Sequence, residues 1–395
     1  MNDTSNSIIE NLPKSKQNFL TNKRLDSIFK TFQNCEQKWL KNDISLTNSK
    51  VFFHKQLKNE SIKQMDSFDN SIRDKIENNS FFEQKFELQI QSNKYNVDFF
   101  HPKGKMSKIQ IQDFFSDCCM KIYIWLSYIQ PFIRTNCSKI MDIYIWFTNE
   151  KKQLIQNEKT FSSKHANSAF TTSCKAETTI YIYRKEEWFK VFIHETFHSL
   201  GLDFSHIMND KYEQQIISLF PVKSIQGIRL YESYCEVWAE LYHTLFIAFF
   251  QSTNLIDFKT MSKSLFFNEL QFSAFQVVKI LKHYDSSLEY DSFIKHKTPV
   301  IVESTSVLSY YIIKFVLLFY CREFETWCSK YNGTLFLQFQ SKNIPLFYQF
   351  IHSKYNSSVI LNYLREIGLE YDKLKLKLKL NIELKRTMRM TLNEI

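Results

Sequence analysis

Apolar and polar positions repeat along this chain with two different periods, and each period predicts a different element. Phe86–Gln91 and Tyr95–Phe100 alternate about the turn-like residues Ser92–Lys94, which predicts a β-hairpin. Alternation returns from Met141, with apolar residues on one side of the pattern, and again in Thr178–Arg184. Two further strands are therefore expected before residue 185.

Helical spacing accounts for most of the remaining pattern. The stretch from Ser107 has apolar residues three and four apart, a serine that can cap its start, and Pro131 near its end. After His206 the chain is expected to be almost wholly helical, with short polar breaks. These helices are predicted over Gly227–Phe250, Phe267–Tyr284, Ser306–Tyr331 and Ile344–Tyr371. The predicted fold class is α+β and helix-dominated.

Changes in composition suggest how the chain is divided. We expect a polar helical N-terminal extension over 1–75, an upper lobe with a small mixed or antiparallel sheet over 76–206, a helical lower lobe over 207–370, and a basic tail over 371–395. In the tail, leucine alternates with Lys373, Lys375, Lys377 and Lys379. A period of two predicts a strand with one charged, solvated face.

The composition is that of a folded protein. The 395 residues include 38 phenylalanines and 20 tyrosines but only five glycines and six prolines, which favours helices over tight turns. The formal charge of +10 indicates a solvated basic surface, and no nucleic-acid partner is expected. The eight cysteines form no C-x-x-C pair and are predicted to be reduced core thiols.

The sequence contains no targeting or membrane signal that we can identify. The polar N-terminal stretch lacks the apolar segment of a signal peptide, and the longest apolar run, Val307–Tyr320, is short and interrupted by Lys314. We therefore expect a cytoplasmic protein that is not secreted and has no membrane partner. No oligomeric state is favoured by the pattern.

Residues able to do chemistry concentrate in the stretch Lys185–His206. There His194, Glu195 and His198 form the motif H-E-x-x-H. On a helix the two histidines stand one turn apart on the same face, where both imidazoles can bind one Zn²⁺ ion. Glu195 lies beside them, in the place of a general base for a zinc-activated water. The motif predicts a hydrolytic zinc site.

The surroundings of the motif fit an active-site helix. The stretch is apolar on most sides, as expected for a helix buried between two lobes. Glu186 and Glu187 are expected in its first turn, and Gly201 is expected to end it in the left-handed conformation. The strand Thr178–Arg184 leads directly into the helix, and this succession is the zincin layout.

A catalytic zinc normally takes three protein ligands and a water, so a third ligand must come from outside the motif. The longer pattern H-E-x-x-H-x-x-G-x-x-H fails because Phe204 stands where the last histidine belongs. Asp203, one residue early, and His206, two residues late, are candidates that would need a different turn geometry.

The stretch Tyr231–His243 offers a better third ligand. Its polar residues fall along one helix face in an otherwise apolar helix, and a polar stripe is costly to bury unless a partner such as a metal satisfies it. These residues are Glu232, Glu236, Glu240 and His243. A solvated stripe of glutamates is the alternative interpretation.

Glu236–Glu240, E-V-W-A-E, resembles the E-x-x-A-E segment of gluzincin metallopeptidases. The resemblance implies a two-lobed zincin-like fold in which Glu236 is the third zinc ligand. It implies that Glu240, with Glu232 near it, orients a ligand imidazole. It also implies peptide-bond hydrolysis with Tyr231 as the first and His243 as the second candidate for stabilising the oxyanion.

The substrate expected from this resemblance is a protein or peptide. An extended peptide could add to an edge strand of the upper lobe, with Ala169–Thr172 or Thr178–Arg184 supplying main-chain partners. Ile182–His198 is also similar to a stretch shared by uncharacterised proteins of large DNA viruses, which implies the host cytoplasm or the virion and no particular activity.

Two other functions compete with the peptidase. The chain could be a catalytically inert, zinc-stabilised scaffold or virion-associated binding protein, although the intact Glu195 argues against a decayed site. It could also be a binder of nucleic acid or anionic surfaces, which rests on the net charge and the lysines of the tail.

Overall fold

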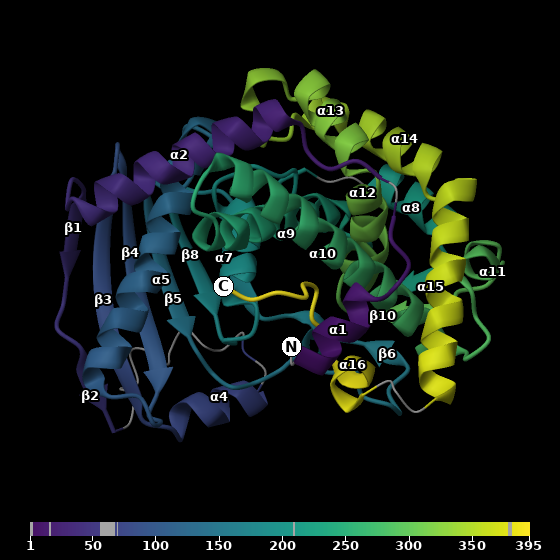
Figure 1. Cartoon of the computed structure of the whole chain (residues 1–395), viewed down its shortest axis with the longest axis horizontal. Coiled ribbons are helices and arrows are strands. Elements are labelled where there is room, and N and C mark those ends of the chain that lie inside the picture. Colours follow the sequence, from purple (N-terminus) through teal and green to yellow (C-terminus); the bar gives the residue numbers. More distant parts are fainter. Residues whose placement is uncertain (1–2, 16, 56–67, 69, 208–209, 378–380) are drawn as a thin grey trace. The chain divides into compact units, whose positions relative to one another are not determined.

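The computed structural model describes residues 3–15, 17–55, 68, 70–207, 210–377 and 381–395. The chain forms two compact units. Unit 1 comprises residues 1–26, 152–167 and 203–395, and unit 2 comprises residues 27–151 and 168–202. Helices and strands occur in both (Figure 1), so the predicted α+β fold class is confirmed.

Unit 2 is built on a seven-stranded mixed sheet with the order β1-β3-β4-β5-β8-β7, in which β2 also pairs with β3. The contacts β4·β5 and β5·β8 are parallel, whereas the remaining pairs are antiparallel. The strands are β1 (Ser45–Asn48), β2 (Phe52–His54), β3 (Phe81–Ile90), β4 (Asn93–Pro102), β5 (Ile140–Trp146), β7 (Ala169–Thr171) and β8 (Glu177–Ile182). The prediction of a mixed sheet in this part of the chain is confirmed.

The locally encoded elements of unit 2 form where the pattern predicts them. β3 and β4 make the expected hairpin, and Gln91 takes a left-handed φ of 53° at its turn. α5 (Lys108–Ile129) begins after Ser107, whose Oγ accepts the N–H of Gln110 at 3.3 Å while the Gln110 side chain accepts the N–H of Ser107 at 2.8 Å. This reciprocal capping box sets the start of the helix. The short 3-10 helix η2 (Gln130–Phe132) follows it.

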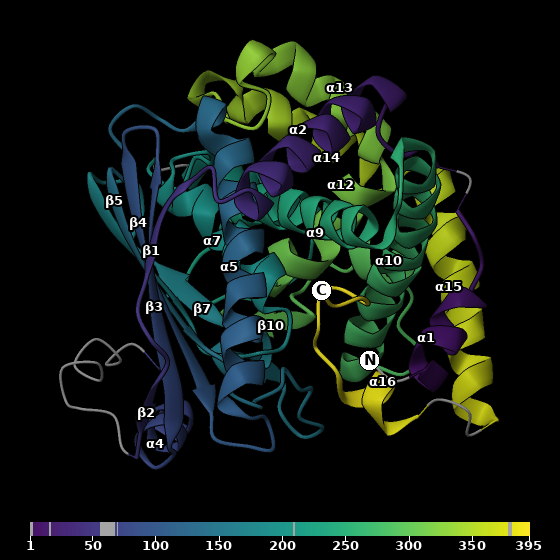
Figure 2. The same cartoon turned by 60° about the vertical axis from the view of Figure 1, so that its left-hand side comes forward.

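α5 and α7 (Trp188–Ser199) pack on one face of this sheet (Figure 2). On this face Phe99 of β4 stacks on Phe115 of α5, and Trp125 of α5 donates its indole N–H to Thr196 of α7 at 2.9 Å. The other face carries an aromatic cluster that packs with α4 (Asn70–Glu77). Because successive residues of a strand point to opposite faces, β5 sends Ile143 and Ile145 to the first face and Trp146 to the second.

The predicted helical extension over 1–75 is only partly helical. α1 (Asp3–Glu10) and α2 (Asn22–Leu40) are helices, but β1 and β2 pair with β3 at the edge of the sheet. Pairing with an existing strand supplies main-chain partners that the local pattern does not reveal. Residues 56–67 of this predicted extension lie outside the described residues.

Unit 1 is dominated by helices arranged around α9 (Leu230–Gln251) and α10 (Leu255–Tyr284). Asn254, the last residue between the two helices, caps α10, because its Oδ1 accepts hydrogen bonds from the N–H groups of Ile256 and Asp257. Unit 1 also contains a three-stranded parallel sheet in the order β6-β10-β9. The remaining elements are β6 (Thr160–Phe161), α6 (Ser163–Ala166), α8 (Asp210–Leu219), β9 (Val222–Ser224), α11 (Tyr290–Ile294), β10 (Ile301–Glu303), the π-helix η3 (Leu308–Ile313), α12 (Lys314–Phe319), α13 (Cys321–Tyr331), the 3-10 helices η4 (Gly333–Leu335) and η5 (Ser341–Asn343), α14 (Ile344–Lys354), α15 (Ser358–Leu376) and α16 (Ile382–Arg386).

The basic tail differs from its prediction. The alternation of leucine and lysine predicts a strand, but α15 continues through Leu376 as a helix. Residues 378–380, which include the last lysine of the pattern, lie outside the described residues. After α16, the residues Thr387–Leu392 are buried rather than solvated. Leucine and lysine are both good helix formers, so a period of two did not determine the conformation.

The prediction that all cysteines are reduced core thiols is wrong for two of them. Cys137 and Cys174 form a disulfide within unit 2. The other six are free and buried, as expected for core thiols: Cys35, Cys118, Cys119, Cys235, Cys321 and Cys328. Across the part of the chain that is described, none of the helices has the length and apolar character needed to span a bilayer.

Candidate metal centre

α7 carries the H-E-x-x-H motif, and all of its residues are buried. The helix begins at Trp188 because Glu187 precedes it with a left-handed φ of 59°. The prediction that Glu186 and Glu187 lie in the first turn is therefore wrong, because both precede the helix. The predicted stop at Gly201 is confirmed by its φ of 67°. The N–H groups of Gly201 and Leu202 return to the carbonyls of His198 and Phe197, which is a Schellman motif.

The two motif histidines converge as the spacing predicts. Nε2 of His194 lies 3.2 Å from Nε2 of His198, and the two rings are inclined at 75° with their centroids 5.0 Å apart. Both side chains are buried, with exposed fractions of 6% and 8%. Glu195, equally buried, is the next residue along the helix. α7 thus presents two imidazole nitrogens to one point, with a carboxylate beside them.

The C-terminal end of α7 is held by the segment Arg134–Ser138 and by the loop that contains Cys174. Four successive carbonyls at this end each accept a hydrogen bond from one of these two segments. Cys174 N–H donates to His198 at 3.1 Å, Ser138 Oγ to Ser199 at 2.8 Å, Arg134 N–H to Leu200 at 3.2 Å, and Arg134 Nε to Gly201 at 2.5 Å. Such bonds satisfy helix-end carbonyls that lack intrahelical partners.

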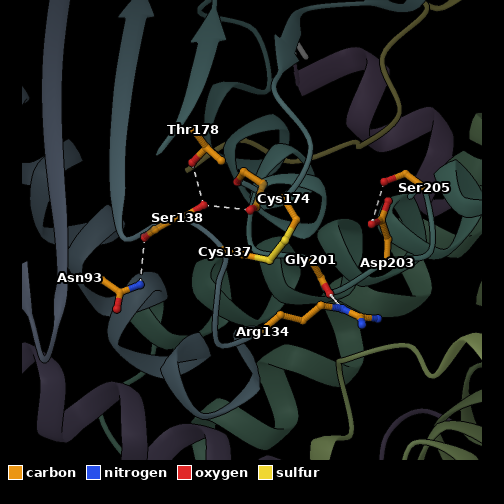
Figure 3. The surroundings of a disulfide bond; sticks show 10 residues. Asn93, Arg134, Cys137, Ser138, Cys174, Thr178, Gly201, Asp203 and Ser205 are labelled. Carbon is orange, nitrogen blue, oxygen red and sulfur yellow. Dashed lines mark hydrogen bonds between the residues drawn. A yellow bond between two sulfur atoms is a disulfide. The ribbon is translucent and has the colours of Figure 1, made fainter. Parts of the chain in front are cut away.

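The Cys137–Cys174 disulfide links the two segments that make these bonds (Figure 3). Ser138, the residue after Cys137, also pairs its hydroxyl with Thr178 of β8 at 2.7 Å. Gly201 packs closely here, because a Cβ at its position would lie 2.7 Å from the sulfur of Cys137. The end of the motif helix is therefore fixed by hydrogen bonds, a covalent bond and close packing together.

The remaining predicted site residues belong to α9 in unit 1. Three glutamates and a histidine along this helix are buried, with exposed fractions of 5% or less: Glu232, Glu236, Glu240 and His243. The interpretation of these residues as a solvated stripe is wrong, because none of them is exposed. Buried carboxylates need cations, hydrogen-bond donors or a metal to offset the loss of hydration.

Glu240 has such a partner. Its Oε2 forms an ion pair with Nζ of Lys314, the first residue of α12, and both side chains are almost fully buried. Burial raises the pKa of the Glu240 carboxyl, and the Lys314 ammonium offsets part of that rise. Oε1 of Glu240 has no hydrogen-bond partner among the described residues. The sequence pattern did not predict this pair, although Lys314 is the one charge in the apolar run Val307–Tyr320.

The two candidates for an oxyanion donor differ in their environment. Nε2 of His243 lies 3.2 Å from the main-chain oxygen of Asn393. Tyr231 is half-buried at the start of α9, and its ring meets the edge of Phe204. Tyr234 is a core residue, as expected, because it is fully buried and donates to the carbonyl of Leu337 at 3.0 Å.

The two alternative third ligands near the motif, Asp203 and His206, have different surroundings. Asp203 is fully buried in unit 1, where Ser205 Oγ donates to its Oδ1 at 3.0 Å and the Cys235 thiol approaches its Oδ2 at 3.7 Å. His206 is exposed. Phe204, which replaces the histidine of the longer pattern, packs against Phe339 with ring centroids 4.3 Å apart. Phe204 is therefore part of the core.

Comparisons with known protein families, with curated proteins and with solved structures gave no match to this chain.

Proposed function

We propose that this chain is a zinc-dependent metallopeptidase of the gluzincin type, with a two-lobed zincin-like fold. The observation that carries the proposal is the 3.2 Å separation of the His194 and His198 Nε2 atoms on a buried helix. Two nitrogens bound to one tetrahedral zinc at 2.0 to 2.1 Å stand about 3.3 Å apart. The imidazole pair therefore fits a single zinc ion without rearrangement.

We assign Glu236 of α9 as the third ligand. It is 1% exposed, and it lies one helical turn before Glu240 on the same helix face. A buried carboxylate that binds a divalent cation recovers the electrostatic stabilisation that it loses with its water. In this assignment the second oxygen of Glu240, which Lys314 leaves without a hydrogen bond, is available to orient a zinc-bound imidazole.

The bound zinc would lower the pKa of a water molecule towards 7 and so supply a nucleophile at neutral pH. Glu195 would accept a proton from that water and donate it to the leaving amine. Tyr231 is our first choice for the hydroxyl that donates to the oxyanion, because the His243 ring is in contact with a main-chain oxygen.

The sheet of unit 2 offers a place for an extended substrate. β7 is the last strand in the sheet order and pairs antiparallel with β8 through Ala169–Thr171. Its second edge can accept a peptide by strand addition, in which main-chain hydrogen bonds give affinity and alternating side chains give specificity. β8 pairs with both β5 and β7, so the alternative stretch Thr178–Arg184 is not an edge to which a peptide can add.

The test compares Glu195→Gln with a control, Glu177→Gln, which changes an exposed residue at the start of β8. We expect one zinc per chain in both proteins, unchanged circular dichroism, and cleavage of a diverse peptide library by the control alone. Loss of the general base should lower the rate by about 10²- to 10⁴-fold. A folded, zinc-loaded wild-type protein that cleaves no peptide would favour the inert scaffold, and a protein that binds no zinc would refute both.

A further inference from the structure

Residues Thr387–Asn393, hereafter the buried segment, pass through the interior of unit 1 without forming a helix. Six successive residues, Thr387–Leu392, are buried, and the side chains of Met388, Met390 and Leu392 are at most 3% exposed. Apart from a single bridge between Gln153 and Thr387, no β-ladder pairs this segment among the described residues. Its main-chain groups must therefore find other partners.

Met388 N–H donates to the main-chain oxygen of Lys152 at 3.0 Å, whereas the carbonyls of the segment find side chains from the surrounding helices. Four consecutive carbonyls, of residues 387 to 390, each accept a hydrogen bond from a buried side chain. The donors are Lys279 to Thr387, Tyr311 to Met388 at 2.5 Å, Gln276 to Arg389, and Lys314 to Met390 at 3.2 Å. Side chains that bind consecutive main-chain carbonyls recognise the backbone, which bends at Met390 and Leu392, and not a particular sequence.

The end of the buried segment is held in the same way. The N–H groups of Leu392 and Asn393 donate to the two carboxylate oxygens of Glu269, at 2.7 and 3.0 Å. Burial lowers the pKa of Lys279 well below its ordinary value and raises the pKa of Glu269, so both side chains would be expensive to bury alone. Main-chain dipoles of the buried segment offset that cost.

Two of these contacts connect the buried segment to the helix that carries the proposed zinc ligand. Lys314 binds both Met390 and Glu240, and His243 lies against the carbonyl of Asn393. Glu240 and His243 follow Glu236 by one and two turns of α9. The buried segment therefore packs along the same face of α9 that presents Glu236.

We propose that the side chains around the buried segment form a binding channel for non-helical peptide segments, and that the buried segment is its intramolecular occupant. The ligand class follows from the contacts: a bent, non-helical peptide segment whose backbone is bound by side chains and whose apolar residues match the buried Met388, Met390 and Leu392. Competition between the buried segment and a peptide substrate rests on the proposed peptidase function. The binding channel itself does not.

The test uses the full chain with a specific protease site inserted directly after Lys377. Cutting leaves residues 378–395 held only by non-covalent contacts, and a fluorescent copy of these residues is the probe. We expect the probe to exchange into the cut protein, with saturable anisotropy, and not into the uncut protein. A probe with N-methyl groups at Leu392 and Asn393 loses two hydrogen bonds to a carboxylate and should bind at least about 100-fold more weakly.

A second probe, in which the three alternating apolar residues are exchanged among Met, Leu and Ile, should bind within about tenfold of the original, because volume-conserving apolar changes are tolerated. Failure of any probe to enter the cut protein, while the protein stays folded, would show that the buried segment is a fixed part of the core and overturn the proposal. Selective loss of binding by the second probe would refute main-chain recognition.

Competition between the buried segment and a peptide substrate is measured separately, as peptide cleavage by the same samples. Dissociation of the buried segment should raise peptide cleavage several-fold, and added probe should reverse the increase. Probe exchange with no cleavage by any sample would leave the binding channel standing and remove the peptidase. Cleavage that is equal before and after cutting, with probe exchange present, would overturn competition with substrate.

Discussion

The main-chain N–H of Cys174 donates a hydrogen bond to the carbonyl oxygen of His198 at 3.1 Å. A disulfide-bonded loop is thus attached directly to a residue whose side chain we assign as a zinc ligand. Three more hydrogen bonds from Arg134 and Ser138 complete the end of α7. The position of the His198 ring therefore depends on contacts that lie outside its own helix.

Removing the disulfide should loosen this end of the helix. The double variant Cys137→Ser/Cys174→Ser is expected to lose about 2 to 4 kcal/mol of unfolding free energy, because the unfolded chain regains the freedom of a closed loop. Zinc affinity, measured by competition with a chelating dye, should fall with it. A thiol reductant should destabilise the wild-type protein and leave the double variant unchanged. Equal zinc affinity in the two proteins would contradict the coupling.

Gly201 is expected to tolerate no side chain. Gly201→Ala places a Cβ 2.7 Å from the Cys137 sulfur and 2.8 Å from Cδ of Arg134, at a φ of 67°. We expect a loss of about 1 to 3 kcal/mol, measured by urea unfolding. Gly368→Ala is the matched control, because Gly368 lies inside α15 with nothing within 4 Å of an added Cβ. It should be neutral or stabilising by up to about 1 kcal/mol.

The choice of Glu236 as the third ligand makes a prediction about zinc stoichiometry. Glu236→Ala should lose the metal during dialysis, as His194→Ala should, while Glu177→Ala retains one zinc per chain. Elemental analysis of the folded variants measures this directly. Full zinc occupancy in Glu236→Ala would move the assignment to another residue, and Glu232→Ala is then the next variant, because Glu232 is also buried on α9.

Removing Lys314 alone should lower the stability of unit 1 more than replacing both Lys314 and Glu240 with uncharged residues. Lys314→Met alone leaves a fully buried carboxyl without its cation and should destabilise unit 1 by about 3 to 5 kcal/mol. Lys314→Met combined with Glu240→Gln removes both charges and should recover at least half of that loss. Additive effects of the two substitutions in chemical denaturation would show that the pair is not coupled.

The buried carboxyl of Glu303 predicts that the stability of the protein depends on pH. Its Oε2 accepts the N–H of Leu308 at the start of η3, and burial raises the pKa of its carboxyl to about 7. Because the folded pKa lies above the unfolded value, the unfolded chain ionises first, and stability falls as the pH rises from about 4.5 to 7. Glu303→Gln should remove up to about 3 kcal/mol of this loss.

The difference between Glu303→Gln and the wild-type protein should be close to zero below pH 4.5 and largest above pH 7. Urea unfolding across this range measures it. Glu366→Gln, which changes an exposed residue of α15, should show no such trend. A constant offset between Glu303→Gln and wild type at every pH would mean that Glu303 acts only through its hydrogen bond.

Local sequence signals predicted the elements that hold the motif. The cap at Ser107, the hairpin of β3 and β4 and the stop at Gly201 each depend on residues close in sequence, and all three were predicted, although the hairpin turn was expected at Ser92–Lys94 and lies at Gln91 and Ser92. The convergence of His194 and His198 follows from helix geometry alone. These parts of the candidate site required no knowledge of long-range contacts.

Contacts between distant residues were not predictable in the same way. The pairing of β1 and β2 with β3, the Cys137–Cys174 disulfide and the Lys314–Glu240 ion pair each join segments whose local patterns contain no signal for the partner. The lysine-rich tail was misread because its period of two matched a strand, whereas helix propensity governs α15. A lone lysine in an apolar run indicates a buried carboxylate partner, but the pattern does not say which one.

The buried segment constrains the order in which this protein can be made. Gln276 of α10 binds the carbonyl of Arg389, which follows it by 113 positions in the chain. Unit 2 ends at Leu202, so a ribosome releases all of its residues while the partners of α10 are still unsynthesised. A nascent unit 1 must keep Lys279 and Glu269 hydrated until residue 393 emerges. A premature stop codon before Thr387 should therefore leave unit 2 unchanged and lower the free energy of unfolding of unit 1, which lacks these hydrogen bonds.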